Sequence, residues 1–166
     1  MSICEVRSHI TDSQFYSGGY TTEEARGIFC DKYRYQRWIQ IEATLASVQA
    51  DLGMIPKWAA EAINEKAHIR HLDLNAVEEG IKTTSHALLP LIEAWQEACE
   101  GTAGEFIHFG ATTQDIQDTA QVLELRDILD IVERDLIAVC RQVTRLTETY
   151  GDLVTIGRTH TQHASP

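Results

Sequence analysis

The chain has 166 residues, of which 43% are apolar, and it carries a formal net charge of −11. This length and composition suit one folded domain with a sizeable core and exclude a disordered chain. The acidic balance argues against binding nucleic acid through the overall field of the protein, so no nucleic-acid partner is expected. An anionic substrate would need a local cluster of positive charge.

Cysteine usage and hydropathy give two further expectations. The four cysteines lie far apart without CxxC spacing, which favours reduced thiols in a cytoplasmic protein: Cys4, Cys30, Cys99 and Cys140. No run of about 18 apolar residues exists, and the first residues lack a signal-peptide pattern, so no membrane partner is expected.

The first half of the chain is predicted to be helical. Thr21 and Glu24 have the spacing of a capping box, after which apolar residues recur every three or four positions until Leu52. Proline at 56 suits the first turn of a short helix, Asp73 can cap another, and Pro90 suits the first turn of the next.

One very long helix is predicted over residues 115–150, because this stretch contains neither proline nor glycine. At about 1.5 Å per residue it would be roughly 54 Å long. Its apolar positions fill more than the single stripe of about 100° that a surface helix needs. The preceding residues are too few to cover it, so we expect its partners to be chain beyond Pro166, other subunits, or both.

The segment 104–115, with the sequence GEFIHFGATTQD, leads into this helix. A helix N-terminus offers N–H donors and a positive dipole end, so Thr112, Thr113 and Gln114 could hold a carboxylate there. The alternative is plain capping, with Thr113 as the N-cap residue and Asp115 serving the helix dipole.

Two more polar clusters contain histidines. They are Thr83–His86 and Gly157–His160, and in each a histidine that can exchange protons near neutral pH follows hydroxyl-bearing residues. A surface or capping histidine is the alternative for each. The pairs 68/71 and 160/163 have i, i+3 spacing, but no carboxylate or cysteine pattern accompanies them, so no metal site is expected.

Four stretches together resemble the fumarase/aspartase superfamily, and its adenylosuccinate lyase branch in particular. They are RYQRWIQIEATLASVQADLGMIP (34–56), TTSHALLPLI (83–92), FIHFGATTQDIQDTA (106–120) and GRTHTQHASP (157–166). The last two are the specific ones.

The resemblance implies an all-α fold with an N-terminal helical domain over residues 1–111 and the start of a central helix bundle over 112–166. It also implies a homotetramer when the protein is full length, and a catalytic serine base that lies beyond this sequence. The 166 residues are therefore expected to be an N-terminal fragment that stops within a site and is inactive alone.

By resemblance, the reaction is a β-elimination that releases fumarate from a small anionic substrate without a cofactor. His160 corresponds to the general acid. The expected substrate-binding residues are Arg34, Tyr35, Ser85, His86, His108, Thr112, Thr113, Gln114, Arg158, Thr159 and Gln162.

The C–N lyase adenylosuccinate lyase, of purine biosynthesis, is the first expectation. However, Ala87 stands where that branch usually has aspartate, and the run Thr112–Gln114 is also similar to 3-carboxy-cis,cis-muconate cycloisomerases. That enzyme is therefore an alternative. A helical assembly module is the non-enzyme alternative, but it leaves the histidine clusters unexplained.

Overall fold

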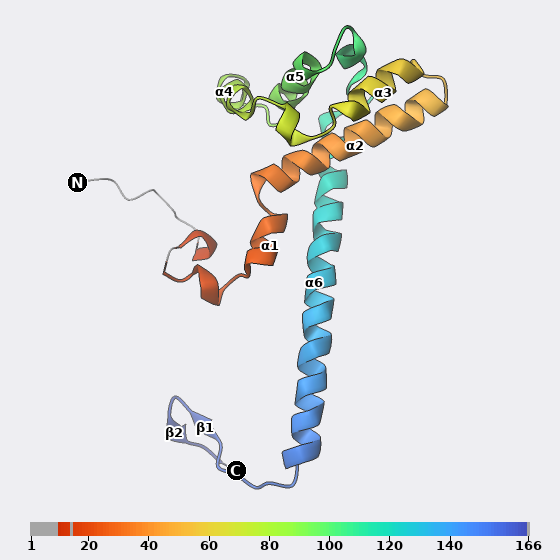
Figure 1. The fold of residues 1–166 in the computed structure, drawn as a ribbon. Coiled ribbons are helices and arrows are strands. Elements are labelled where there is room, and N and C mark those ends of the chain that lie inside the picture. The colour runs from red at the N-terminus through yellow and green to blue at the C-terminus, as the bar shows by residue number, and fades with distance from the viewer. Residues whose placement is uncertain (1–9, 14, 166) are drawn as a thin grey trace, which may run out of the picture. The chain divides into compact units, whose positions relative to one another are not determined.

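The computed structural model describes residues 10–13 and 15–165; Cys4 and Pro166 lie outside them. It consists almost entirely of helices, with one small hairpin near the end of the chain (Figure 1). The α-helices and strands are α1 (Glu23–Ile28), α2 (Asp31–Asp51), α3 (Lys57–Glu65), α4 (Leu74–Thr84), α5 (Leu89–Ala98), α6 (Thr113–Tyr150), β1 (Arg158–Thr159) and β2 (Gln162–His163). Short 3-10 turns occupy Ile10–Asp12, Ser17–Gly19, Ile69–His71 and Ala103–Phe106. The all-α prediction is confirmed.

Several local predictions are confirmed by the helix ends. The side chain of Asp73 accepts hydrogen bonds from the N–H groups of Asn75 and Ala76, so it caps α4 as expected. Proline 90 lies in the first turn of α5, where its missing N–H leaves no bond unmade. Pro56 is the N-cap residue of α3, one position before the predicted first turn.

The prediction for the first helix was wrong in two respects. Its cap is Thr22, whose hydroxyl accepts from the Ala25 N–H at 3.2 Å, and not Thr21. The helix also does not continue to Leu52, because the chain leaves helical geometry at Phe29 and Cys30 and begins α2 at Asp31. A period of three to four residues cannot reveal such a break, and the nearby glycine, Gly27, lies inside α1 and not at the break itself.

The core lies among α2, α3, α4, α5 and the first turns of α6. Helices α2 and α3 run side by side (Figure 1), and the Asn64 amide of α3 donates to Ser47 Oγ of α2 at 2.9 Å. The largest fully buried side chains are Trp95, Ile39, Ile63, Leu88, Leu91, Ile116 and Val77.

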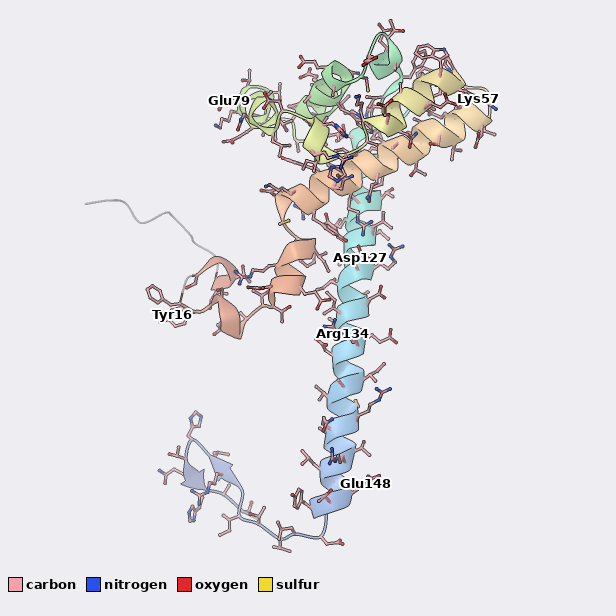
Figure 2. All side chains as sticks on the ribbon, in the orientation of Figure 1. Tyr16, Lys57, Glu79, Asp127, Arg134 and Glu148 are labelled. Carbon is pink, nitrogen blue, oxygen red and sulfur yellow. The ribbon has the colours of Figure 1, made fainter. Side chains whose placement is uncertain are left out.

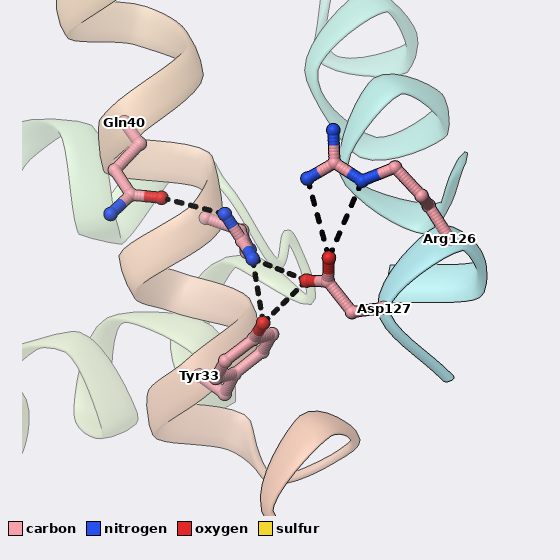
Figure 3. A network of polar contacts seen from close by, with 5 residues as sticks. Tyr33, Gln40, Arg126 and Asp127 are labelled. Atoms are coloured by element: carbon pink, nitrogen blue, oxygen red, sulfur yellow. Dashed lines mark hydrogen bonds and ion pairs between the residues drawn. The ribbon is translucent and has the colours of Figure 1, made fainter. Parts of the chain in front are cut away.

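Two ion pairs hold α2 to α6. Arg34 bonds the carboxylate of Glu124, and three residues further along each helix Arg37 bonds that of Asp127. Tyr33 donates to Asp127 at 2.5 Å, and Arg126 bonds the other oxygen of this carboxylate (Figure 3). Because the acids on α6 share the i, i+3 spacing of the arginines on α2, the pairs fix the register between the two helices.

The second half of α6 belongs to a separate compact unit, whose boundary lies between Ile128 and Leu129. Side chains project from it on all sides (Figure 2). A regular seam of exposed apolar residues follows the helix with spacings of three and four: Val122, Leu125, Leu129, Val132, Leu136, Val139, Val143, Leu146 and Tyr150. The predicted domain start at residue 112 falls one residue before α6 begins; the division into domains there stays a prediction.

None of the helices described here is long and apolar enough to cross a lipid bilayer. Within residues 10–13 and 15–165, Cys30, Cys99 and Cys140 are free thiols.

Asp127→Asn should weaken the attachment of α2 to α6 in a pH-dependent way. The hydrogen bond from Tyr33, assisted by Arg126 and Arg37, lowers the pKa of Asp127. A lowered pKa stabilises the fold above the unfolded value of about 3.9, and this contribution is lost as the pH falls through the folded value. We expect the variant to cost about 1–2 kcal/mol at pH 7 and less at pH 3.

Urea unfolding of residues 1–166, followed by tryptophan fluorescence, measures this effect, because Trp38, Trp58 and Trp95 all lie in the unit that contains Asp127. Glu79→Gln is the control, since Glu79 lies in the same unit and its ion pair with Lys82 is 72% and 58% exposed, so its removal should leave the free energy of unfolding close to wild type. A difference between wild type and Asp127→Asn that stays the same at both pH values would contradict the role of the carboxylate charge.

Candidate active site

The N-terminus of α6 is closed by a carboxylate. Thr112 directly precedes the helix, and its N–H donates to Asp115 Oδ2 at 3.0 Å, while the Asp115 N–H donates to the Thr112 carbonyl at 3.0 Å. This is one half of a capping box, in which the side chain of the third helical residue accepts the N–H of the N-cap residue; the return bond goes to the Thr112 backbone carbonyl and not to its hydroxyl. The reading of Thr113 as the N-cap is therefore wrong: Thr113 is the first residue of the helix, and its hydroxyl is turned to another partner.

That partner is His86. Ser85 is the C-cap residue of α4 and adopts a left-handed conformation with φ of 55°. The chain turns there, and His86 Nδ1 accepts a hydrogen bond from the Leu89 N–H at 2.9 Å. Since Nδ1 accepts, a neutral ring carries its proton on Nε2, which lies 3.4 Å from Thr113 Oγ1. The ring can then donate to the threonine oxygen and leave the hydroxyl hydrogen of Thr113 for another acceptor.

His108 is held by a carboxylate from α2. Its Nδ1 lies 2.5 Å from Glu42 Oε1, and Glu42 is only 3% exposed. Burial raises the pKa of Glu42, and the hydrogen bonds from the ring and backbone of His108 oppose that rise. The backbone of His108 is left-handed, with φ of 65°, which is uncommon for a residue that is not glycine.

A cavity of about 490 Å³ lies where α2 faces the first turns of α6, within the size range of small-molecule sites. It is lined by Phe29, Arg34, Trp38, Ala87, Gln114, Gln117, Asp118, Ala120, Gln121, Glu124 and Leu125. Ala87 directly follows His86, and Gln114 follows Thr113, so the cavity adjoins the His86–Thr113 contact.

Arg34 and Tyr35 differ in their relation to this cavity. Nε and Nη2 of Arg34 each lie 3.2 Å from an oxygen of Glu124, a carboxylate that is 3% exposed, and this bond raises the pKa of Arg34. Arg34 lines the cavity, but part of its charge is compensated. The ring of Tyr35 packs on Trp38 with centroids 5.3 Å apart, and Tyr35 is not among the residues that line the cavity.

The segment after α6 forms a hairpin, which the all-α prediction did not include. Arg158 pairs with His163, and Thr159 pairs with Gln162. The two residues between them, His160 and Thr161, have φ of 47° and 65°. Positive φ at both central positions is typical of a type I′ turn, which usually takes asparagine and glycine. His160 is thus exposed at the tip of the turn, and Arg158, Thr159 and Gln162 are exposed on the strands.

The structure therefore brings together only some of the predicted site residues. His86 and Thr113 are in contact, and Gln114 and Arg34 line the adjoining cavity. The hairpin that carries His160 belongs to the second compact unit, which begins at Leu129. Within the part of the chain that the structure describes, no group of three or more histidine, cysteine or acidic side chains gathers as it would around a metal ion.

Sequence reasoning missed Glu42 and Glu124, the two buried acids that hold His108 and Arg34. A signal for Glu42 was present, because it occurs among Ile39, Ala43 and Ala46 on the apolar face of a predicted helix. A charged residue on a buried face requires a partner.

Comparison with known proteins agrees with the motifs. A family model described as Lyase matches residues 18–166. Adenylosuccinate lyase of Methanocaldococcus jannaschii is 42% identical over 147 residues, which are 89% of this chain and 32% of that protein. N-acetyl-S-(2-succino)cysteine lyase of Enterococcus italicus is 40% identical over 159 residues, 96% of this chain and 35% of that protein.

A solved structure shares the fold. The 3-carboxy-cis,cis-muconate lactonizing enzyme of Pseudomonas putida matches with a TM-score of 0.81 and 33% identity over 92% of this chain and 35% of that one. The sequence thus spans about a third of the length of the relatives that it matches. Its motifs, its helical fold and the family match over almost its whole length together show that the chain belongs to the lyase family of the fumarase/aspartase superfamily.

Proposed function

We propose that the full-length protein releases fumarate from a substituted succinate by β-elimination. The observation that carries this proposal is the N-terminus of α6, where the Thr113 hydroxyl meets His86 Nε2 at 3.4 Å beside a cavity of about 490 Å³. Helix N–H groups and a hydroxyl hydrogen converge there, and such an arrangement suits a carboxylate. The family relationship supports the reaction type.

The chemistry explains why donors are needed. A base removes a proton from the carbon next to one carboxylate, the electron pair forms the carbon–carbon double bond, and the bond to the leaving nitrogen or sulfur breaks. Negative charge builds on the carboxylate as the proton leaves, so donors fixed in advance lower the barrier. We assign this role to Thr112, Thr113 and Gln114, with Ser85 and His86 as the support from the end of α4. The base itself would come from chain outside the 166 residues.

The leaving group needs a proton as it departs, and we assign this step to His160. The hairpin supports the assignment, because it presents the imidazole at the tip of a turn, where a neighbouring subunit can reach it. Arg158, Thr159 and Gln162 flank it on the strands and offer donors to an anionic substrate. We assign Arg34, which lines the cavity beside its partner Glu124, to the substrate-binding residues, and Tyr35 supports the cavity wall by packing on Trp38.

A homotetramer would cover the apolar seam of α6. Apolar residues at alternating spacings of three and four are typical of helices that pack side by side in bundles. Nine such residues from Val122 to Tyr150 are exposed by 43% to 64%. We propose that identical helices of other subunits bury this seam and bring their sites together, with residues 1–111 as a separate N-terminal domain.

Adenylosuccinate is the first candidate substrate, which would place the enzyme in purine biosynthesis in the cytoplasm. N-acetyl-S-(2-succino)cysteine is the second, because the relative that acts on it aligns with 96% of this chain and because Ala87 gives the cavity no acid at that position.

The purified full-length protein, assayed for fumarate with these two compounds and for turnover of 3-carboxy-cis,cis-muconate, tests the proposal. Fumarate from either succinate supports it, and no fumarate from both overturns it.

In the full-length protein, His160→Ala should lower kcat by about 10²–10⁴-fold, the usual loss when a general acid is removed. His163→Ala is the matched control, since this residue lies on the adjacent strand of the same hairpin, paired with Arg158. Steady-state fumarate release should show only a few-fold change for the control. Similar losses in both variants would mean that the hairpin fold, and not the imidazole of His160, is required.

Thr113→Val should raise KM or lower kcat by about tenfold or more, because a hydroxyl donor to the carboxylate is lost. The melting temperature of the variant should change little, because the Thr112 N–H at the start of α6 donates to Asp115 and not to the Thr113 hydroxyl. Thr119→Val is the control: its hydroxyl donates to the Asp115 carbonyl within the same helix. Thr112→Val should follow Thr113→Val if both hydroxyls act on the substrate. Wild-type kinetics in folded Thr113→Val would refute the assignment.

A further inference from the structure

The pair formed by Glu42 and His108 calls for a physical explanation, because a carboxylate in the core is costly. Glu42 lies on α2 among core residues and is 3% exposed. One of its oxygens meets His108 Nδ1 at 2.5 Å, and the other, Oε2, finds no hydrogen-bond partner among the described residues. A core position filled by leucine would avoid the cost of desolvating this acid.

The strain on the partner residue also points to a function. His108 occupies a left-handed conformation that a glycine would adopt more readily. The same loop is tied to α2 at a second place, where Gln49 Nε2 donates to the Phe109 carbonyl at 2.7 Å. The loop is therefore anchored without Glu42, so anchoring alone does not require the acid.

We infer that Glu42 is a positioning residue for His108: its buried carboxylate accepts the Nδ1–H of the imidazole and so fixes the direction in which Nε2 meets the substrate. This inference rests on the proposed function. The geometry fixes the ring from one side only, since the His108 side chain remains 22% exposed. With Nδ1 engaged by the carboxylate, the direction of the ring is set and Nε2 is the nitrogen left to bond the substrate.

This arrangement would give an anionic substrate a polar side chain that is held in a fixed position. The net charge of −11 repels an anionic substrate at long range, so binding depends on local donors. An imidazole held in place by a buried acid provides a polar group whose direction is fixed before the substrate binds.

The test compares three variants of the full-length protein. Glu42→Leu removes both the charge and the acceptor, Glu42→Gln keeps the volume and one acceptor oxygen, and Gln49→Leu loosens the same loop without touching the ring. We expect Glu42→Leu to raise KM by roughly 10–100-fold with kcat changed less than about threefold, because a charged hydrogen bond to the ring is lost. Glu42→Gln should lie between this variant and wild type, and Gln49→Leu should leave KM close to wild type.

A second readout does not depend on activity. Diethyl pyrocarbonate modifies unprotonated imidazole nitrogens, and peptide mapping by mass spectrometry gives the rate at each histidine. At pH 7, the labelling rate of His108 should differ from wild type in Glu42→Leu and Glu42→Gln and stay at the wild-type value in Gln49→Leu, with exposed His68 as the internal reference. If wild type releases no fumarate, the proposed function fails while the labelling result still tests the contact.

The inference is overturned if folded Glu42→Leu keeps wild-type KM and labelling, or if Gln49→Leu changes both as much as Glu42→Leu does. If Glu42→Leu does not fold, Glu42→Gln decides the matter, because an isosteric amide keeps the packing. Wild-type KM and labelling in Glu42→Gln would then show that Glu42 serves the fold only.

Discussion

The attachment of α2 to α6 is the constraint on which the candidate site depends. Arg34 and Arg37 lie one turn apart on α2, and they meet Glu124 and Asp127, which lie one turn apart on α6. A shift of either helix by one residue would break both pairs and leave the buried Glu124 without its partner, which is far more costly than losing a surface ion pair. These contacts thereby fix where α2 presents Glu42 and where α6 begins.

The second consequence of this register concerns the cavity. Its walls come from α2 and Phe29 just before it, from Ala87 between α4 and α5, and from the first turns of α6, so its shape depends on the same pairs. Arg34 takes part in both: it lines the cavity and bonds Glu124. An arginine held in this way is a rigid side chain whose charge is paired with the Glu124 carboxylate. Rigid donors are useful in catalysis because no reorganisation is needed when charge develops.

Much of the fold follows from local sequence rules, and the site does so only in part. Helix ends and helix lengths depend on neighbouring residues, so they could be predicted from Asp73, from Pro90 and from the uninterrupted stretch 115–150. The break at Phe29 and Cys30 and the turn at His160 could not, because neither carries glycine or proline. The pairing of His86 with Thr113 joins residues 27 positions apart, and that of Glu42 with His108 spans 66 positions. Sequence motifs identify such residues as candidates, but only the packed structure shows which of them are in contact.

The seam on α6 also has a handedness. From Val122 to Tyr150 its apolar residues keep a spacing of 3.5 residues per turn over 28 positions, whereas a straight α-helix needs 3.6. The seam therefore drifts by about 20° in each seven residues and by about 80° over its whole length. A straight partner helix could touch it only locally. Any helix that packs along all of it must wind around α6 in a left-handed supercoil, with the two axes crossing at about 20°.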